Sequence, residues 1–119
     1  MRTVRLGTSG IEVSEFVFGA GSIGGVGASA STRGAGLSSE EGFERLDEAV
    51  GFGITLVDTA DSYGGGESEK TVGRWLHDRQ PRGVVVATKV GLISRPDGSR
   101  GIDLSRGHVE RTLARSIER

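Results

Sequence analysis

The sequence predicts an α/β protein that opens with a β-hairpin and continues with about three β/α units. Three observations support this class. The chain has 119 residues, which is enough for one domain. Apolar runs typical of strands begin near residues 16, 54 and 84. A segment with apolar residues at helical period follows each run. Such an alternation of strands and helices produces a parallel sheet with right-handed crossovers.

Residues 1–14 should form the hairpin. Apolar and polar residues alternate over Val4–Leu6 and again over Ile11–Val13, and two glycines flank the turn between these runs. The hairpin enters the sheet at the N-terminal end of the first parallel strand. We therefore expect it to cover the end of the sheet opposite the C-terminal ends of the strands.

The first β/α unit should contain a long loop. Phe16–Phe18 is a continuous apolar run, which is typical of a strand buried on both faces. Residues 19–36 contain seven glycines and show neither a helical nor a strand period. A helix should begin at Ser38, because Ser38 and Glu41 stand at the spacing of a capping box.

The second and third units follow the same plan. Each strand delivers a charged residue at its C-terminal end, Asp58 after the second and Lys89 after the third. A polar loop should lead from Lys89 to the last helix. The expected elements are a strand at 54–57, a helix at about 67–78, a strand at 84–88 and a helix capped by Ser105.

Three parallel strands make a narrow sheet with exposed edges. A (β/α)8 barrel takes about 250 residues, so three units would be three of its eight. We therefore expect residues 1–119 to be the N-terminal part of a single TIM-barrel domain, truncated before closure, with the hairpin over its bottom. Ligands of parallel α/β folds bind at the C-terminal ends of the strands, which here are Gly19, Asp58 and Lys89.

Composition excludes several classes of protein. Cysteine is absent, which excludes disulfide frameworks, thiolate metal sites and thiol nucleophiles. The net charge of −1 argues against a nucleic-acid partner. No apolar run approaches the roughly 18 residues of a membrane span, so we expect a cytoplasmic protein without a membrane partner. No metal is expected, because nothing adds ligands to Asp58 and Asp61, and His77 and His108 are predicted to be surface residues.

The run Gly19-Ala20-Gly21-Ser22-Ile23-Gly24 matches the glycine pattern of dinucleotide-binding Rossmann units. In such a unit the loop opens directly into a helix whose N-terminus holds the pyrophosphate. Here the first helix signal comes only at Ser38. The pattern therefore favours a flexible loop at the functional edge, and a Rossmann dehydrogenase stays as an alternative.

One further set of residues gathers at the strand ends. Asp58 and Lys89 end strands that should be neighbours, and Tyr63, the only tyrosine, lies just past Asp58. One interpretation is a structural salt bridge beside an incidental tyrosine. The other is an acid catalyst, because a lysine ammonium favours the ionised form of a nearby phenol, typically by ~1–3 pKa units. Tyr63 could then protonate a developing alkoxide while Asp58 holds Lys89 charged.

The stretch Asp58-Thr59-Ala60-Asp61-Ser62-Tyr63-Gly64, with Ala87-Thr88-Lys89 about thirty residues later, resembles the aldo-keto reductases. The N-terminal stretch Leu6–Ser14 is similar to the N-terminal hairpin of that family. Gly64–Glu69 resembles the stretch that leads into the family's second helix. The resemblance extends over essentially all of the chain.

The resemblance implies a (β/α)8 barrel that binds NADPH without a Rossmann fold. It also implies an oxidoreductase that reduces aldehydes or ketones, or oxidises alcohols or sugars, by hydride transfer. Asp58, Tyr63 and Lys89 would take three of the family's four catalytic roles, with Tyr63 as the general acid. The cofactor contacts that it implies are Gly19, Ala20, Gly21 and Asp58.

The chain departs from the family pattern in three ways. The family's fourth catalytic residue is a histidine after the next strand, which would lie beyond Arg119. The family's site for the cofactor phosphate would also lie beyond it. Gly21 stands where many members carry an aromatic side chain. We therefore expect the isolated 119 residues to be inactive, and a non-catalytic, nucleotide-binding regulatory subunit of the same fold remains an alternative.

Overall fold

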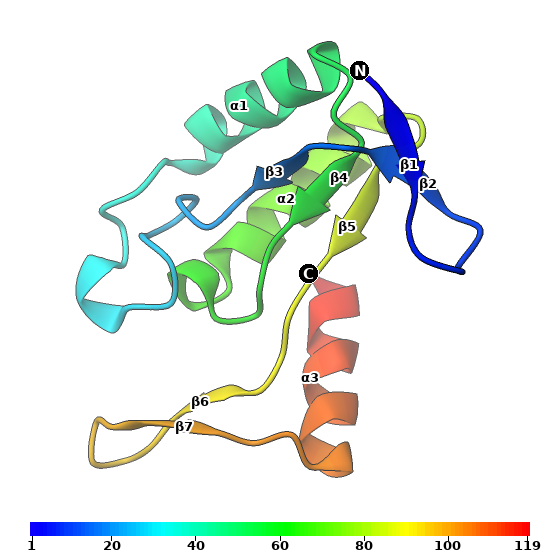
Figure 1. Ribbon diagram of the computed structural model, residues 1–119. Helices are drawn as coiled ribbons and strands as arrows, with labels where there is room; N and C mark the ends of the chain where they lie inside the picture. Colours follow the sequence, from blue (N-terminus) through cyan, green and yellow to red (C-terminus); the bar gives the residue numbers. More distant parts are fainter.

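The computed structural model describes residues 1–119. Figure 1 shows a parallel sheet backed by two helices, a hairpin at the N-terminus and a third helix at the C-terminus. The strands are β1 (Thr3–Arg5), β2 (Glu12–Ser14), β3 (Val17–Gly19), β4 (Leu56–Asp58), β5 (Val85–Ala87), β6 (Leu92–Ser94) and β7 (Arg100–Ile102). The α-helices are α1 (Ser39–Gly51), α2 (Glu67–Arg79) and α3 (Arg106–Glu118), and 3-10 turns span Ala30–Thr32 and Tyr63–Gly65.

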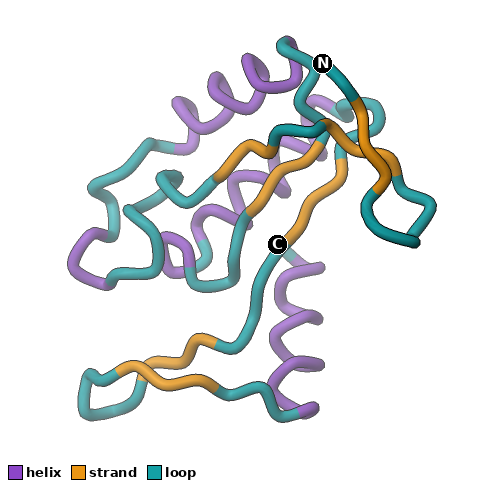
Figure 2. Tube along the Cα trace, viewed as in Figure 1, coloured by secondary structure: helices purple, strands orange, loops and turns teal.

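The central sheet has the order β3-β4-β5, and all its strands run parallel. In this register Gly19 pairs with Asp58, and Asp58 pairs with Ala87. The C-terminal ends of the three strands therefore meet at one edge (Figure 2). The predicted α/β class and the three parallel units are confirmed, and the sheet is open.

The N-terminal hairpin is tied to the start of β4. The Ser14 backbone N–H donates to Oγ1 of Thr55 at 2.8 Å, and the Thr55 backbone N–H donates to Oγ of Ser14 at 2.9 Å. The hairpin therefore lies beside the ends at which the parallel strands begin (Figure 1). The assignment of residues 1–119 to a single barrel domain stays a prediction.

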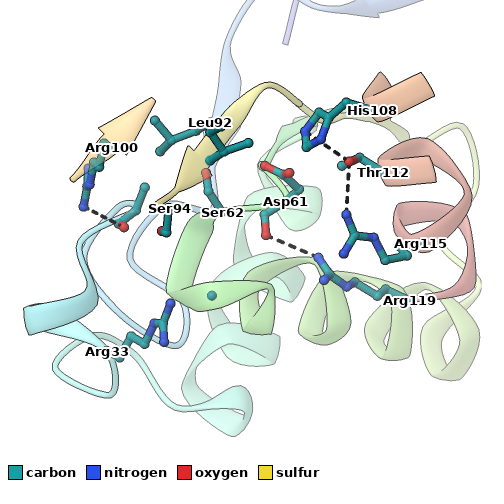
Figure 3. Close-up of a pocket in the computed structure, with 13 residues that line it drawn as sticks. Arg33, Asp61, Ser62, Leu92, Ser94, Arg100, His108, Thr112, Arg115 and Arg119 are labelled. Carbon is teal, nitrogen blue, oxygen red and sulfur yellow. Dashed lines mark hydrogen bonds between the residues drawn. The ribbon is translucent and has the colours of Figure 1, made fainter. Parts of the chain in front are cut away.

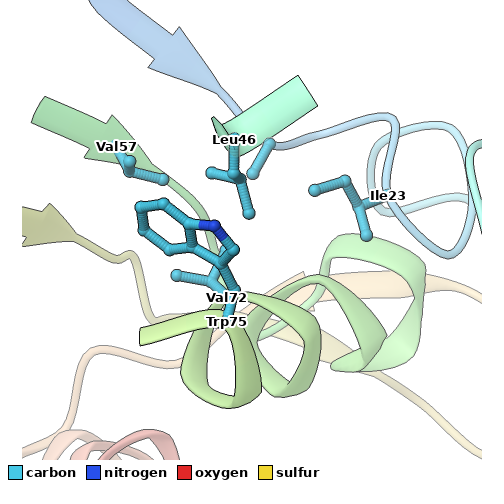
Figure 4. Close-up of a cluster of buried hydrophobic side chains, with 6 residues drawn as sticks. Ile23, Leu46, Val57, Val72 and Trp75 are labelled. Atoms are coloured by element: carbon cyan, nitrogen blue, oxygen red, sulfur yellow. The ribbon is translucent and has the colours of Figure 1, made fainter. Parts of the chain in front are cut away.

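The hydrophobic core lies between the sheet and helices α1 and α2. Trp75 on α2 is 1% exposed, and its indole N–H donates to Asp47 of α1 at 2.8 Å. Burial of so large a ring contributes strongly to the stability of this layer. The fully enclosed core side chains, shown in Figure 4, are Ala20, Ile23, Leu46, Val57, Val72 and Trp75.

The expectation that Phe16–Phe18 is buried on both faces is wrong. Phe16 is 62% exposed and Val17 is 48% exposed, whereas Phe18 packs against the core. Successive strand residues point to opposite faces of a sheet. Since the helices cover only the face that Phe18 and Val57 share, Val17 lies on the uncovered face.

The expected polar loop before Ser105 is also wrong in part, because it contains the β6–β7 hairpin. Its turn is stabilised by Asp97, which accepts hydrogen bonds from the backbone N–H and the hydroxyl of Ser99 at 2.9 and 2.7 Å. These bonds lower the pKa of the Asp97 carboxyl. An aspartate that binds the backbone two residues further on is typical of tight turns.

The glycine-rich segment forms a folded loop against the turn that holds Tyr63. The Gly27 N–H donates to the Gly21 carbonyl at 2.7 Å, and the Gly64 N–H donates to the Gly27 carbonyl at 3.0 Å. Gly64 has φ +60°, and a Cβ there would lie 2.9 Å from the carbonyl carbon of Gly24. Only glycine fits so close an approach. The first α-helix begins at Ser39, so no helix opens from the glycine pattern as a Rossmann unit requires.

The capping box of α1 is confirmed and provides a test of local stability. Oγ of Ser38 accepts from the Glu41 N–H at 3.2 Å, and Oε2 of Glu41 accepts from the Ser38 N–H at 2.8 Å. We expect Ser38→Ala to lower the free energy of unfolding by about 1 kcal/mol in urea titrations followed by circular dichroism. Ser38→Asp keeps a capping acceptor and should unfold like the wild type. Equal losses in both variants would contradict the capping role.

Candidate active site

The structure brings Asp58, Tyr63 and Lys89 together at the C-terminal edge of the central sheet. Nζ of Lys89 lies 2.6 Å from Oδ2 of Asp58 and 3.2 Å from the hydroxyl oxygen of Tyr63. The same ammonium lies 4.8 Å from the centre of the Tyr63 ring. The three side chains predicted from their positions in the sequence therefore form one hydrogen-bonded group.

Three elements of the fold position this group. Asp58 is the last residue of β4, and Lys89 follows β5 by two residues. The Asp61 N–H donates to the Lys89 carbonyl at 3.2 Å, which joins the two loops beyond those strands. Tyr63 opens the 3-10 turn whose second residue, Gly64, packs against the glycine-rich loop. The phenol is thereby directed back toward the strand ends.

Lys89 is the charged centre of the group. Burial of its ammonium acts to lower the pKa of Lys89, but the hydrogen bonds to Asp58 and Tyr63 outweigh burial and raise that pKa above its ordinary value. Lys89 is therefore protonated throughout the physiological pH range. The side chains of Lys89 and Asp58 are 49% and 34% exposed, so the ion pair is open to a ligand.

The residues predicted to contact a cofactor differ in accessibility. Gly19 is exposed beside Asp58, and a Cβ built on it would meet nothing within 4 Å. Gly21 lies beside the Tyr63 ring, since a Cβ there would be 3.5 Å from it. Ala20 is fully buried in the core. Gly19 therefore leaves open space next to the charged group and Gly21 contacts the Tyr63 ring, whereas the Ala20 side chain offers no surface.

Sequence reasoning missed two sets of contacts around the group. The Thr59 carbonyl accepts from Nζ of Lys89 at 3.0 Å, a backbone contact that no sequence signal announces. Buried Glu69 accepts from Nη1 of Arg119 at 2.6 Å and from the Thr88 hydroxyl at 2.5 Å. Glu69 thereby links α2 to α3 and to the residue before Lys89.

The two histidines lie apart from Lys89 and its partners, and only one is a surface residue. His77 is exposed on α2, as predicted. His108 on α3 is only 14% exposed, and its Nδ1 lies 3.7 Å from Oδ2 of Asp103. The expectation for His108 was therefore wrong, because α3 turns this residue toward the loop after β4 (Figure 3). None of the three α-helices has the length and the apolar composition that a membrane span requires.

Comparison with known proteins places these residues in a family. The model of the aldo/keto reductase family matches residues 16–119. The chain is 33% identical over 121 residues to "Uncharacterized oxidoreductase YqkF" of Bacillus subtilis, covering all of this chain and 35% of that protein. It is 34% identical over 116 residues to L-galactose dehydrogenase of Arabidopsis thaliana, covering 96% of this chain and 33% of that protein. Aldo-keto reductase yakc [NADP(+)] of Schizosaccharomyces pombe is 33% identical over 87 residues, which are 71% of this chain and 26% of that protein.

Solved structures agree in fold. The aldo-keto reductase AKR11C1 from Bacillus halodurans, in its holo form, matches with a TM-score of 0.77 and 30% identity, over 99% of this chain and 36% of that one. The glycerol dehydrogenase AKR11B4 from Gluconobacter oxydans matches with a TM-score of 0.78 and 28% identity, over 98% and 35%. This chain thus spans about a third of the length of the relatives YqkF and L-galactose dehydrogenase. Its three β/α units match part of a reductase barrel, and the chain belongs to the aldo/keto reductase family.

Proposed function

We propose that this chain supplies the acid-catalytic part of an NADPH-dependent oxidoreductase that interconverts carbonyl compounds and alcohols. The observation that carries the proposal is the contact of the Lys89 ammonium with both Asp58, at 2.6 Å, and the Tyr63 hydroxyl, at 3.2 Å. A structural salt bridge would need only the first contact. The second gives the tyrosine a cation that stabilises its phenolate, which is what a general acid requires.

The residues at the strand ends are compatible with a nicotinamide ring. The space above Gly19 is open, and its neighbour in the sheet, Asp58, presents a half-exposed carboxylate. A flat ring laid on this edge would reach the Tyr63 phenol without meeting a side chain at Gly19 or Gly21. NADPH, when bound, supplies the hydride that reduces the carbonyl carbon.

The chain's own residues handle the proton. As the carbonyl oxygen gains negative charge, the Tyr63 hydroxyl donates its proton to that oxygen. The phenolate that remains is stabilised by the ammonium of Lys89, and Asp58 holds this ammonium in place. In the reverse direction the phenolate removes the proton from an alcohol, so the same group serves oxidation.

A nucleotide-binding regulatory subunit of the same fold is the competing function. Turnover separates the two, and we propose to measure it in a chimeric barrel. Residues 1–119 would replace the matching third of AKR11C1 from Bacillus halodurans, whose structure this chain matches over 99% of its length. We expect NADPH deuterated at C4 to deliver its label to the carbinol carbon of the product, and the 119 residues alone to show no turnover. A folded chimera that binds NADPH without turnover would favour the regulatory function.

A further inference from the structure

A second polar pocket lies beside the loop that carries Tyr63. It is a cavity of about 340 Å³ between residues 61–65, the β6–β7 hairpin and α3 (Figure 3). Asp58, Tyr63 and Lys89 do not line it. Its volume is at the lower end of the range for small-molecule sites, about 300–1,000 Å³. The pocket is thus large enough for a small ligand and separate from the proposed catalytic group.

The floor of the pocket is built from hydrogen-bonded groups of α3 and of Arg119, the residue that follows it. Thr112 is 2% exposed, and its hydroxyl lies 3.4 Å from Nε2 of His108 and accepts from Nη2 of Arg115 at 3.2 Å. Nη1 of Arg119, the residue that follows α3, donates to Glu69 at 2.6 Å and to the Asp61 carbonyl at 3.3 Å. These contacts hold the shape of the floor.

Three arginines around the opening lack an acidic partner. Arg115 bonds only to the Thr112 hydroxyl, and Arg100 bonds only to the Ala28 carbonyl, at 2.8 Å. The Arg33 guanidinium makes no hydrogen bond and no salt bridge, although it lies beside the Gly65 backbone. Of the seven arginines that line no pocket, three are paired with a glutamate and one with an aspartate, whereas Arg5, Arg82 and Arg95 have no acidic partner. Three unpaired guanidinium groups therefore converge on one cavity from three separate segments.

From this convergence we propose that the pocket binds the phosphate group of a small molecule. Guanidinium groups present paired N–H donors that match the oxygens of a tetrahedral oxyanion, and such charge-assisted hydrogen bonds are stronger than neutral ones. The Thr112 hydroxyl and the His108 ring add polar atoms at the floor. A phosphate dianion balances the charge of three guanidinium groups better than a ligand with a single carboxylate does.

One group in the pocket opposes an anion. The carboxyl of Asp61 lines the same cavity, and burial together with nearby Glu69 raises the pKa of Asp61, while Arg119 and His108 act in the opposite direction. An ionised Asp61 repels phosphate. Removal of this charge in Asp61→Asn should therefore tighten phosphate binding, an effect opposite in sign to that of an arginine substitution.

The test measures binding by the whole 119-residue chain and needs no enzyme activity. Inorganic phosphate and glycerol phosphate would be titrated separately, by isothermal calorimetry and by the shifts of backbone amide signals of residues 61–65. We expect Arg115→Gln and Arg33→Gln each to weaken phosphate binding about fivefold, and Asp61→Asn to tighten it by a similar factor. Arg111→Gln is the matched control, because Arg111 lies on α3 outside this pocket.

The outcomes separate the possibilities. Tighter binding of glycerol phosphate than of inorganic phosphate would identify a phosphate ester as the ligand, and the reverse order would identify the free ion. Equal weakening of phosphate binding by Arg111→Gln and Arg115→Gln would show that the effect comes from general surface charge, and would overturn the proposal. So would an Asp61→Asn variant with a native circular dichroism spectrum that binds phosphate no better than the wild type does.

Discussion

Tyr63→Phe is expected to lower kcat for carbonyl reduction by about 10²- to 10⁴-fold in the chimeric barrel, with little change in the affinity for NADPH. The substitution removes the proton donor and keeps the ring that packs beside Gly21. Packing and the cofactor site therefore change little, whereas the developing alkoxide loses its acid. Steady-state kinetics with an aldehyde substrate and fluorescence titration with NADPH measure the two quantities.

Two further measurements make this test specific. The deuterium transferred from labelled NADPH should still reach the same carbon in whatever slow reaction remains, because the loss concerns the proton and not the hydride. Retention of most of the wild-type kcat in Tyr63→Phe would remove Tyr63 as the acid. The Asp58–Lys89 pair would then revert to a structural salt bridge.

Lys89→Met is expected to be comparably damaging, because the phenolate of Tyr63 loses the ammonium that lies 3.2 Å from its oxygen. Lys89→Arg tests the geometry as well as the charge. The guanidinium keeps the positive charge but is planar and larger than an ammonium, so it cannot make the contacts to Asp58, Thr59 and Tyr63 from the same compact position. We expect kcat in Lys89→Arg to fall severely as well.

Lys70 offers a matched control for both Lys89 variants. It is the only other lysine, and it forms an exposed pair with Glu67 within α2. Lys70→Met should leave kcat unchanged, because exposed pairs at this spacing contribute little. Wild-type turnover in Lys89→Arg would show that charge alone is sufficient and that the compact geometry at Lys89 is unimportant.

Strong local patterns made most of the fold predictable. The capping box at Ser38 placed the start of α1 to within a residue. Asp58 and Lys89 could be placed at one sheet edge because parallel strands that follow one another in sequence are usually neighbours. Tyr63 then needed only to lie in the loop between them. The candidate site was therefore predictable as a set of residues, although its hydrogen bonds were not.

Long-range contacts explain what could not be predicted. The exposure of Val17 depends on which faces of the sheet are covered, and the run Phe16–Phe18 is equally apolar in either case. The burial of His108 depends on where α3 packs, which no local pattern specifies. The β6–β7 hairpin was missed for another reason. Its turn carries a recognisable signal, Pro96-Asp97-Gly98, but each of its two strands is only three residues long.

The ion pair between Glu69 and Arg119 has a consequence for folding during synthesis. The two residues are 50 positions apart, and the Glu69 side chain is 4% exposed once Arg119 has reached it. At about 5–20 residues per second, a ribosome needs roughly 3–10 s to add the intervening chain. Until then the Glu69 carboxylate has no cation to accompany it into the interior, and desolvation of an unpaired charge is strongly unfavourable. We therefore expect the N-terminal turn of α2 to reach its final packing only after Arg119 has been translated.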